Sequence, residues 1–402
     1  MEYQKTNLKE GITQNIELLH VQVMNVTDVK ILKVHVNVNV MENSIKTIRQ
    51  IESSHRGLGI PLHFANLCSL ADISCFYIGE MGSGKGTLIK SIKAYDVDYD
   101  MNLYTINIVT LFKKFYNEGH GIVDKKILWR VDEWSTLKEV HRDMFMSLGA
   151  ELITDHRYSH VSGASVYQSL ELKMENIILV AFVGIQPIKF AHMTTGEQVG
   201  ETWNALTSDR FLKFALINPL RTKTNRATPE YTFSPRLPRK ELVTVNSELG
   251  IMKMALKDQV SEDRLPLFCE SLIKAYCKYE GYETVTPKAE IEFKKLFGFY
   301  LSLYGMFTYT LDINEGNKFS CGAFRLLNAI SRHEGKSFPD LIEYFKIYNK
   351  SGKEENYIKE MKMELKILER YDLAHPYSES EPRMYTSQRV DDYFQWYRDV
   401  MH

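Results

Sequence analysis

Short apolar runs alternate with amphipathic stretches along much of the chain after residue 60. An uninterrupted apolar run of about four to eight residues is typical of a strand buried on both faces, and apolar residues spaced three and four apart are typical of a helix. Because such runs and stretches alternate, the pattern predicts an α/β fold with a parallel sheet. The strands predicted in this way are 75–78, 102–109, 126–131, 176–186 and 211–217.

The composition divides the chain into five segments. Residues 1–59 carry mixed signals for a strand and a helix, and residues 60–220 form the strand-rich core. Residues 221–262 are basic, contain prolines and lack periodicity, which indicates a linker. Residues 263–335 carry apolar residues at helical spacing. Residues 336–402 predict a helix, a second helix and a hairpin, an order that resembles a winged-helix domain.

Composition and charge exclude several classes of protein. A chain of 402 residues with 44% hydrophobic residues can bury more than one core, and its formal net charge of -1 gives no whole-chain signature of polyanion binding. Five cysteines form no CxxC pair or zinc spacing, which favours buried, reduced thiols. Since no apolar run is long enough to cross a bilayer and the first residues lack an apolar signal core, we expect a soluble, cytoplasmic protein without a membrane contact.

A glycine-rich turn joins the strand at 75–78 to a predicted helix. Its spacing matches the P-loop, or Walker A, pattern, in which backbone amides, the start of a helix and a lysine ammonium meet phosphate oxygens. The hydroxyl expected directly after the lysine is replaced by glycine, so the next residue is the candidate to meet Mg²⁺. The residues expected to bind ATP are Gly79, Gly82, Ser83, Gly84, Lys85, Gly86 and Thr87.

This loop alone leaves its chemistry open. A Gly-Lys-Gly-Thr sequence resembles the loop of adenylate-kinase-like nucleotide kinases as well as that of some ATPases, so phosphoryl transfer to a metabolite and ATP hydrolysis both fit. A glycine-rich turn with a chance lysine is the third interpretation.

Two adjacent acids, Asp132 and Glu133, end the strand at 126–131, about 47 residues after Lys85. If this strand neighbours the P-loop strand, Asp132 lies on the magnesium side of the loop and holds the metal, in the manner of a Walker B acid. Glu133 then polarises the attacking water. A pair of solvated acids at a strand end is the alternative.

Two further polar residues mark strand ends. Gln186 closes the strand at 176–186, where an amide beside the two acids helps to orient water; alternatively, it simply opens a turn at Pro187. Arg210 directly precedes the last strand, where the plain interpretation is a salt-bridged or solvated arginine at a helix end. Between them, residues 154–163 predict a surface hairpin with Arg157 and Tyr158, which suit phosphate contact and base stacking in a central pore, or an ordinary solvated loop.

The order of P-loop, Asp132-Glu133, Gln186 and Arg210 over roughly residues 60–220 resembles the core of the AAA+ ATPases. That resemblance implies an extra strand between the P-loop strand and the acidic strand. It also implies that Arg210 acts as an arginine finger on a neighbouring subunit. The hairpin insertion resembles the branch of the minichromosome-maintenance helicases, whereas Gly86 and Gln186 depart from the common motifs of the superfamily.

The resemblance also implies a role for the second half of the chain. In AAA+ proteins a helical lid follows the sheet and supplies a second arginine to the γ-phosphate; Arg325 is the best match in segment 263–335, with Arg332 as its rival. The winged-helix-like segment carries mixed charge, so it suits a protein partner as well as DNA.

Together these features predict a Mg²⁺-dependent ATPase that works as a homo-oligomeric motor or loader on DNA. The catalytic residues are expected to be Lys85, Glu133, Gln186 and Arg210, and the metal ligands Thr87 and Asp132. An adenylate-kinase-like nucleotide kinase and a nucleotide-switched scaffold that hydrolyses slowly are the alternatives.

Overall fold

The structure is a computed structural model, and its chain divides into two compact units, Met1–Val40 and Met41–His402. All descriptions below concern the second unit. The described residues are 41–79, 82–103, 122–162, 170–187, 189–190, 209–216, 227–238, 240–257, 259–303, 326–327, 329–330, 335–337, 340–341, 354–370, 373–376, 383–386, 390, 396–397 and 399–400.

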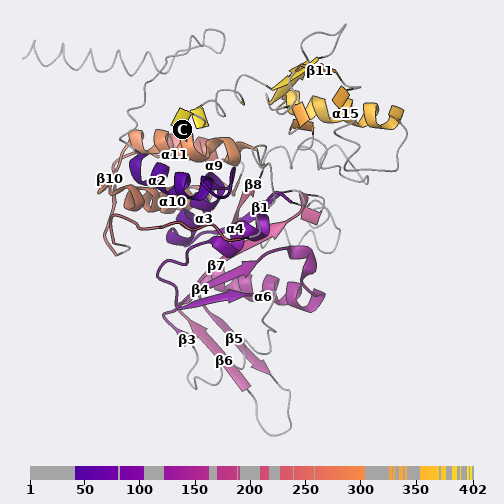
Figure 1. Ribbon diagram of the computed structural model, residues 1–402. Helices are drawn as coiled ribbons and strands as arrows, with labels where there is room; N and C mark the ends of the chain where they lie inside the picture. Colours follow the sequence, from indigo (N-terminus) through magenta and orange to yellow (C-terminus); the bar gives the residue numbers. More distant parts are fainter. Residues whose placement is uncertain are drawn as a thin grey trace, which may run out of the picture. The chain divides into compact units, whose positions relative to one another are not determined.

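A five-stranded parallel sheet forms the centre of this unit (Figure 1). Its spatial order is β2-β4-β7-β1-β8, so the chain crosses over the sheet between consecutive strands. The α/β fold with a mostly parallel sheet is therefore confirmed. The strands are β1 (Ser74–Ile78), β2 (Tyr99–Asn102), β4 (Lys126–Val131), β7 (Ile178–Ile185) and β8 (Phe211–Ala215).

The structure bears on two sequence expectations about this sheet. The second strand lies at Tyr99–Asn102, upstream of the expected 102–109, whose larger part falls outside the described residues. The acidic strand β4 is not a direct neighbour of the P-loop strand β1, because β7 pairs with both of them. Strand β7 thus lies between β1 and β4.

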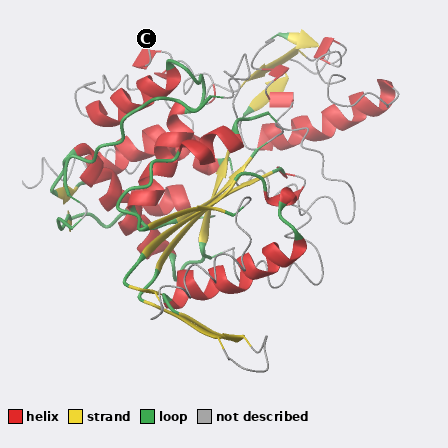
Figure 2. Ribbon diagram, turned by 60° about the horizontal axis from the view of Figure 1, so that its bottom comes forward, coloured by secondary structure: helices red, strands yellow, loops and turns green. Residues whose placement is uncertain are grey.

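Helices cover both faces of the sheet (Figure 2). Helix α6 (Glu139–Asp155) packs on one face of the sheet and α4 (Lys85–Ser91) packs on the other face. Each of the two helices contacts β7. Helix α3 (Gly59–Leu70) is buried along its whole length, because it lies between β1 and the helices α2 (Glu42–Glu52) and α10 (Leu265–Glu280). An apolar helix without a polar face fits this doubly covered position.

The helical segment joins the sheet through aromatic side chains. Phe214 of β8 stacks on Tyr300 of α11 (Pro287–Ser302) at 5.1 Å between ring centroids, and Phe64 of α3 lies 5.3 Å from Phe297. Residues 221–262, expected to be a linker, include helix α9 (Gly250–Leu256), which packs on α10 and α11. This part of the chain therefore belongs to the helical layer.

Smaller sheets complete the described fold. Strands β5 (Tyr158–Ser162) and β6 (Leu170–Glu175) form an antiparallel hairpin, and β3 (Ile122–Val123) pairs with β6. The hairpin expected at 154–163 therefore begins later, because α6 continues to Asp155, and only its first strand lies within that range. Near the C-terminus, α15 (Glu354–Arg370) accompanies an antiparallel sheet in the order β11-β13-β12. Its strands are Lys336–Ser337, Arg383–Thr386 and Ala374–Pro376.

Two further observations concern the described part of the chain. Its four cysteines, Cys68, Cys75, Cys269 and Cys277, are buried free thiols. No helix among the described residues is long and apolar enough to cross a membrane.

A buried carboxylate fastens the start of α2 to the end of α10. Glu280 accepts hydrogen bonds from the backbone amides of Asn43 (3.2 Å) and Ser44 (2.8 Å) and from the Ser44 hydroxyl. Burial is the main reason that the pKa of Glu280 is raised. These amides open α2, where helix N–H groups lack partners within the helix, so Glu280 caps α2 from a distant helix.

Replacing this cap should destabilise the protein. We expect Glu280→Ala to lower the free energy of unfolding by about 2–4 kcal/mol, because it leaves buried donors without an acceptor. Urea denaturation measures the change. The control variant Glu283→Ala removes an exposed acid three residues away and should change the free energy of unfolding by less than about 0.5 kcal/mol. Equal losses of stability in the two variants would refute the capping role.

Candidate functional site at the glycine-rich loop

The loop begins where β1 leaves the sheet. The amide of Gly79 donates to the carbonyl of Ile185 at 3.1 Å, so the first loop residue is still held by β7. A Cβ atom on Gly79 would lie 2.7 Å from the Ser83 hydroxyl oxygen and 2.9 Å from the carbonyl oxygen of Leu216. Only glycine fits between the returning loop and the end of β8.

Two glycines give the loop its curvature. Gly82 has φ of 81° and Gly84 has φ of 103°, both in the left-handed region that side chains disfavour. Gly84 directly precedes α4, so the chain turns from strand to helix within a few residues. Glu80 and Met81 lie outside the described residues.

The Lys85 ammonium is buried at this turn. Its side chain is 6% exposed, and Nζ donates to the carbonyl of Gly79 at 2.7 Å. The carboxylate oxygen Oε2 of Glu133 is 3.7 Å from Nζ. The lysine therefore reaches from α4 across the loop to the end of β4, and it brings the predicted P-loop residue and the predicted base together.

Asp132 is held beside the same helix by a second lysine. Its Oδ2 lies 2.7 Å from Nζ of Lys90, which is about half exposed. Its Oδ1 is buried and has no hydrogen-bond partner among the described residues, and the same is true of the Ser83 hydroxyl. Since buried polar atoms nearly always have partners, two such atoms at this edge suit a polar ligand.

A glycine in β7 lets the backbone of Asp132 approach. A Cβ atom on Gly184 would lie 2.3 Å from the carbonyl oxygen of Asp132, which is far inside van der Waals contact. The position of the acid therefore depends on the missing side chain of the neighbouring strand.

Gln186 follows β7 and is half-buried between the two halves of the site. The register pairs Ile78 with Ile185 and Val131 with Val183, so Gln186 lies level with Gly79 on one side and one residue beyond Glu133 on the other. Its carbonyl accepts the amide of Phe190 at 2.9 Å. Gln186 thus follows the strand that pairs with both β1 and β4, and its role in orienting water stays a prediction.

The residues of this edge fit a bound Mg²⁺. No cluster of three metal-ligating side chains occurs among the described residues. Magnesium, however, is commonly held by one or two carboxylates together with substrate phosphates and water. Asp132 Oδ1 is a suitable ligand, and Lys90 would have to share or leave the carboxylate. Thr87 lies in the first turn of α4 and has a half-exposed side chain. At the preceding residue, Gly86, an added Cβ atom would meet open space.

Arg210 does not join this site. It precedes β8, and the pairing of Phe211 with Ser74 puts it level with the start of β1. At about 3.3 Å per residue, the six-residue length of strand from Ile73 to Gly79 separates Arg210 from the loop by about 20 Å. Its Nε donates to the hydroxyl of Thr154. Arg325 and Arg332 lie outside the described residues.

Sequence analysis missed Lys90 and Gly184. An isolated glycine within a buried strand is a signal of close backbone approach, so Gly184 was recognisable. Lys90 looked like any exposed lysine on a helix, and only the structure reveals its carboxylate partner.

No known protein-family model matches this chain, and no curated protein matches it significantly. Its function is therefore argued from the geometry of the site.

A methyl group at Gly184 should displace Asp132. We expect Gly184→Ala to lower the free energy of unfolding by about 1–3 kcal/mol, because the added Cβ overlaps the Asp132 carbonyl. Thermal or urea unfolding measures this. In Gly149→Ala the Cβ meets Trp129 at an ordinary 3.6 Å, so that variant should keep or gain stability. A neutral Gly184→Ala would contradict the close approach.

Restoring a hydroxyl at position 86 should strengthen metal binding. Since a side chain at Gly86 meets open space, we expect Gly86→Ser to fold normally and to lower the Mg²⁺ concentration that half-saturates nucleotide binding several-fold. The control is Gly86→Ala, which adds the same Cβ without oxygen. If both variants require the same Mg²⁺ as the wild type, position 86 does not face the metal.

Proposed function

We propose that the chain is a Mg²⁺-dependent, ATP-hydrolysing ATPase of the AAA+ type. The observation that carries this proposal is the buried Lys85 ammonium, 2.7 Å from the Gly79 carbonyl and 3.7 Å from Glu133. A cation at a tight glycine loop stabilises the charge on the β- and γ-phosphates of ATP. Two acids at the end of β4 then supply a ligand for the metal and a base.

Each residue has a defined role in the proposed reaction. Asp132 holds Mg²⁺, which neutralises phosphate charge when it is bound. Glu133 accepts a proton from the attacking water, and Gln186 orients that water from the neighbouring strand. Lys85 releases the Gly79 carbonyl and donates to the γ-phosphate instead. The water oxygen bonds to the γ-phosphorus as the bond from that phosphorus to the bridging β-phosphate oxygen breaks, and ADP and inorganic phosphate leave.

The sheet order supports the AAA+ type. β7 separates β1 from β4, as the resemblance to that superfamily requires, and the β5–β6 hairpin interrupts the chain between α6 and β7. We also propose that the chain resembles the minichromosome-maintenance-like branch of this superfamily and that residues 336–402 form a winged-helix-like domain.

The position of Arg210 supports an oligomer. About 20 Å from its own loop, this arginine can assist catalysis only at a neighbouring subunit's nucleotide. In such a ring, the exposed Arg157 at the base of β5 and the half-buried Tyr158 suit contact with DNA. We therefore propose action on DNA as a homo-oligomeric motor or loader.

Substitution of two site residues separates binding from turnover. We expect Lys85→Ala to lower the rate of ATP hydrolysis at least about 100-fold, because it removes the positive charge that stabilises the transition state. Glu133→Gln should bind ATP like the wild type and hydrolyse it about 100-fold or more slowly, because it removes the base. Phosphate release measures both, with the exposed Glu175→Gln as the acid control. Normal turnover by Glu133→Gln would eliminate the proposed base.

The type of reaction is tested by what stimulates it. We expect single- or double-stranded DNA to raise the ATPase rate and nucleoside monophosphates to leave it unchanged, because a motor couples hydrolysis to its track. Phosphorylation of a monophosphate would favour the adenylate-kinase-like alternative instead. Slow hydrolysis that responds to neither would favour the nucleotide-switched scaffold.

A further inference from the structure

The ion pair between Lys90 and Asp132 lies beside the glycine-rich loop. Nζ of Lys90 is 2.7 Å from Oδ2 of Asp132, and Oδ1 of the same carboxylate is buried without a hydrogen-bond partner among the described residues. Asp132 is the carboxylate that the proposed reaction assigns to Mg²⁺, whereas Lys90 has no role in that reaction. A cation of the chain therefore already contacts the group that the metal would use.

The two elements that carry this pair are fastened to each other by an arginine. Arg130 of β4 donates to the carbonyl of Ile89 at 2.6 Å and to that of Ile92 at 2.9 Å, at the C-terminal end of α4. The same guanidinium donates twice to the carboxylate of Asp100 on β2, at 2.6 and 2.7 Å. These contacts fix the backbone on both sides of Lys90 relative to the acidic strand.

Of the two partners, the lysine is the one with room to move. The backbone of Asp132 is packed against β7, where a Cβ atom on Gly184 would lie 2.3 Å from the Asp132 carbonyl oxygen. The side chain of Asp132 is 17% exposed and that of Lys90 is 56% exposed. Since lysine carries its ammonium on a flexible four-carbon stem, Lys90 can turn into water while the carboxylate stays in place.

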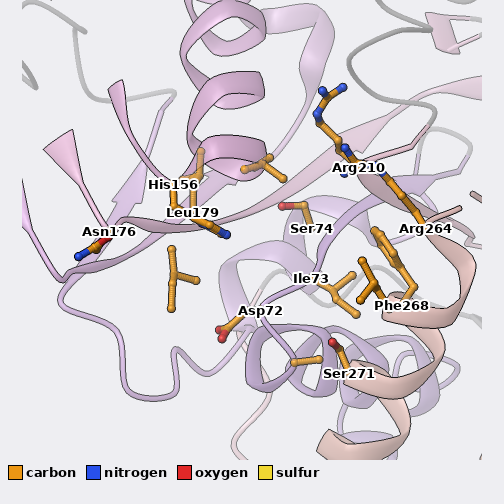
Figure 3. Close-up of a pocket in the computed structure, with 14 residues that line it drawn as sticks. Asp72, Ile73, Ser74, His156, Asn176, Leu179, Arg210, Arg264, Phe268 and Ser271 are labelled. Atoms are coloured by element: carbon orange, nitrogen blue, oxygen red, sulfur yellow. The ribbon is translucent and has the colours of Figure 1, made fainter. Parts of the chain in front are cut away.

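A second lysine–aspartate pair of this fold differs in both respects. Nζ of Lys126 lies 2.6 Å from Oδ1 of Asp72, but the Lys126 side chain is only 3% exposed and also donates to the carbonyl of Ser69. Asp72 lines a hollow of about 570 Å³ at the start of β1, the strand end opposite the glycine-rich loop (Figure 3). The buried lysine is thus tied in place by two acceptors, whereas Asp132 is the one ion-pair partner of Lys90 among the described residues.

A divalent cation and the Lys90 ammonium compete for the same carboxylate. Mg²⁺ is commonly held by one or two carboxylates together with phosphate oxygens and water, and two cations close to each other repel. In contact with Lys90, the charge of Asp132 is partly compensated, so a nucleotide without metal meets less repulsion from this acid. Once Lys90 has turned away, both oxygens of Asp132 can face the metal.

We propose that Lys90 is a positioning residue that sets the metal requirement of the glycine-rich loop. It contacts Asp132 in the metal-free protein and turns into solvent when a nucleotide binds with its Mg²⁺. The inference rests on the proposed function, because it takes Asp132 as a ligand of the metal. Without this lysine, Asp132 would repel a metal-free nucleotide and would hold the metal without a competitor, so nucleotide binding should depend more strongly on Mg²⁺.

The coupling between metal and nucleotide tests this role. The measurement is the dissociation constant of mant-AMPPNP, a fluorescent, non-hydrolysable ATP analogue, for the full chain in EDTA and in saturating Mg²⁺. The ratio of the first constant to the second measures how strongly the metal favours the nucleotide. A variant that only weakens the fold or a phosphate contact, equally in both conditions, leaves this ratio unchanged.

Three lysine variants give the expected pattern. Lys90→Gln should raise the ratio about fivefold, because it removes a half-exposed ion pair that the metal has to break. Lys90→Arg keeps the charge and should stay within about twofold of the wild type. Lys257→Gln, at an exposed cation of α9's C-terminal end, is the control and should leave the ratio unchanged. A change of less than about twofold in Lys90→Gln would overturn the proposal.

The Asp132→Asn background shows whether Lys90 acts through that carboxylate. There, Lys90→Gln should change the ratio by less than about twofold. An equal rise with and without Asp132 would mean that Lys90 acts on the nucleotide directly, and would overturn the proposal.

The same data separate this proposal from the ATPase proposal. If Asp132→Asn lowers the ratio but Lys90→Gln leaves it unchanged, the metal ligand stands and the role of Lys90 is refuted. If Asp132→Asn keeps the wild-type ratio, Asp132 is not the ligand, and both proposals fail.

Discussion

The organisation of the candidate site depends on the Lys85 ammonium being held out of water. A buried charge is costly unless it is paired and hydrogen-bonded. At 6% exposure, Lys85 donates to the Gly79 carbonyl and has the Glu133 carboxylate at 3.7 Å, beyond hydrogen-bond distance. The Gly79 carbonyl thus compensates part of the charge, an arrangement that suits its exchange for a phosphate oxygen.

The strand order provides the space that this exchange needs. Neighbouring strands lie about 4.8 Å apart, so β7 holds β1 and β4 roughly 10 Å from each other. Side chains from both strand ends, rather than backbone, span this distance. Gly184 then sets how closely the Asp132 backbone approaches β7, while the two lysines of α4 meet the two acids. Phosphates and a metal would occupy the space between charges of both signs.

Much of this was predictable because it is local. The apolar runs at 75–78 and 126–131 and the Gly79–Thr87 spacing each depend on neighbours in the sequence, and the helices at 265–280 and 287–302 follow from periodicity. Non-local pairing was harder. Nothing in the run at 178–185 states that it pairs with both β1 and β4. The ion pair between Lys90 and Asp132 joins residues far apart in the sequence, and so does the like-charge effect of Arg264 on Arg210. Both emerge only in three dimensions.

The central claim is that the loop around Lys85 binds a triphosphate. Its most direct test is equilibrium titration with a fluorescent ATP analogue in the presence of Mg²⁺. The account predicts saturable binding that Lys85→Ala weakens at least about 100-fold, equivalent to about 2.7 kcal/mol, while the exposed Lys257→Ala leaves it unchanged. Wild-type affinity in the Lys85→Ala protein would contradict it.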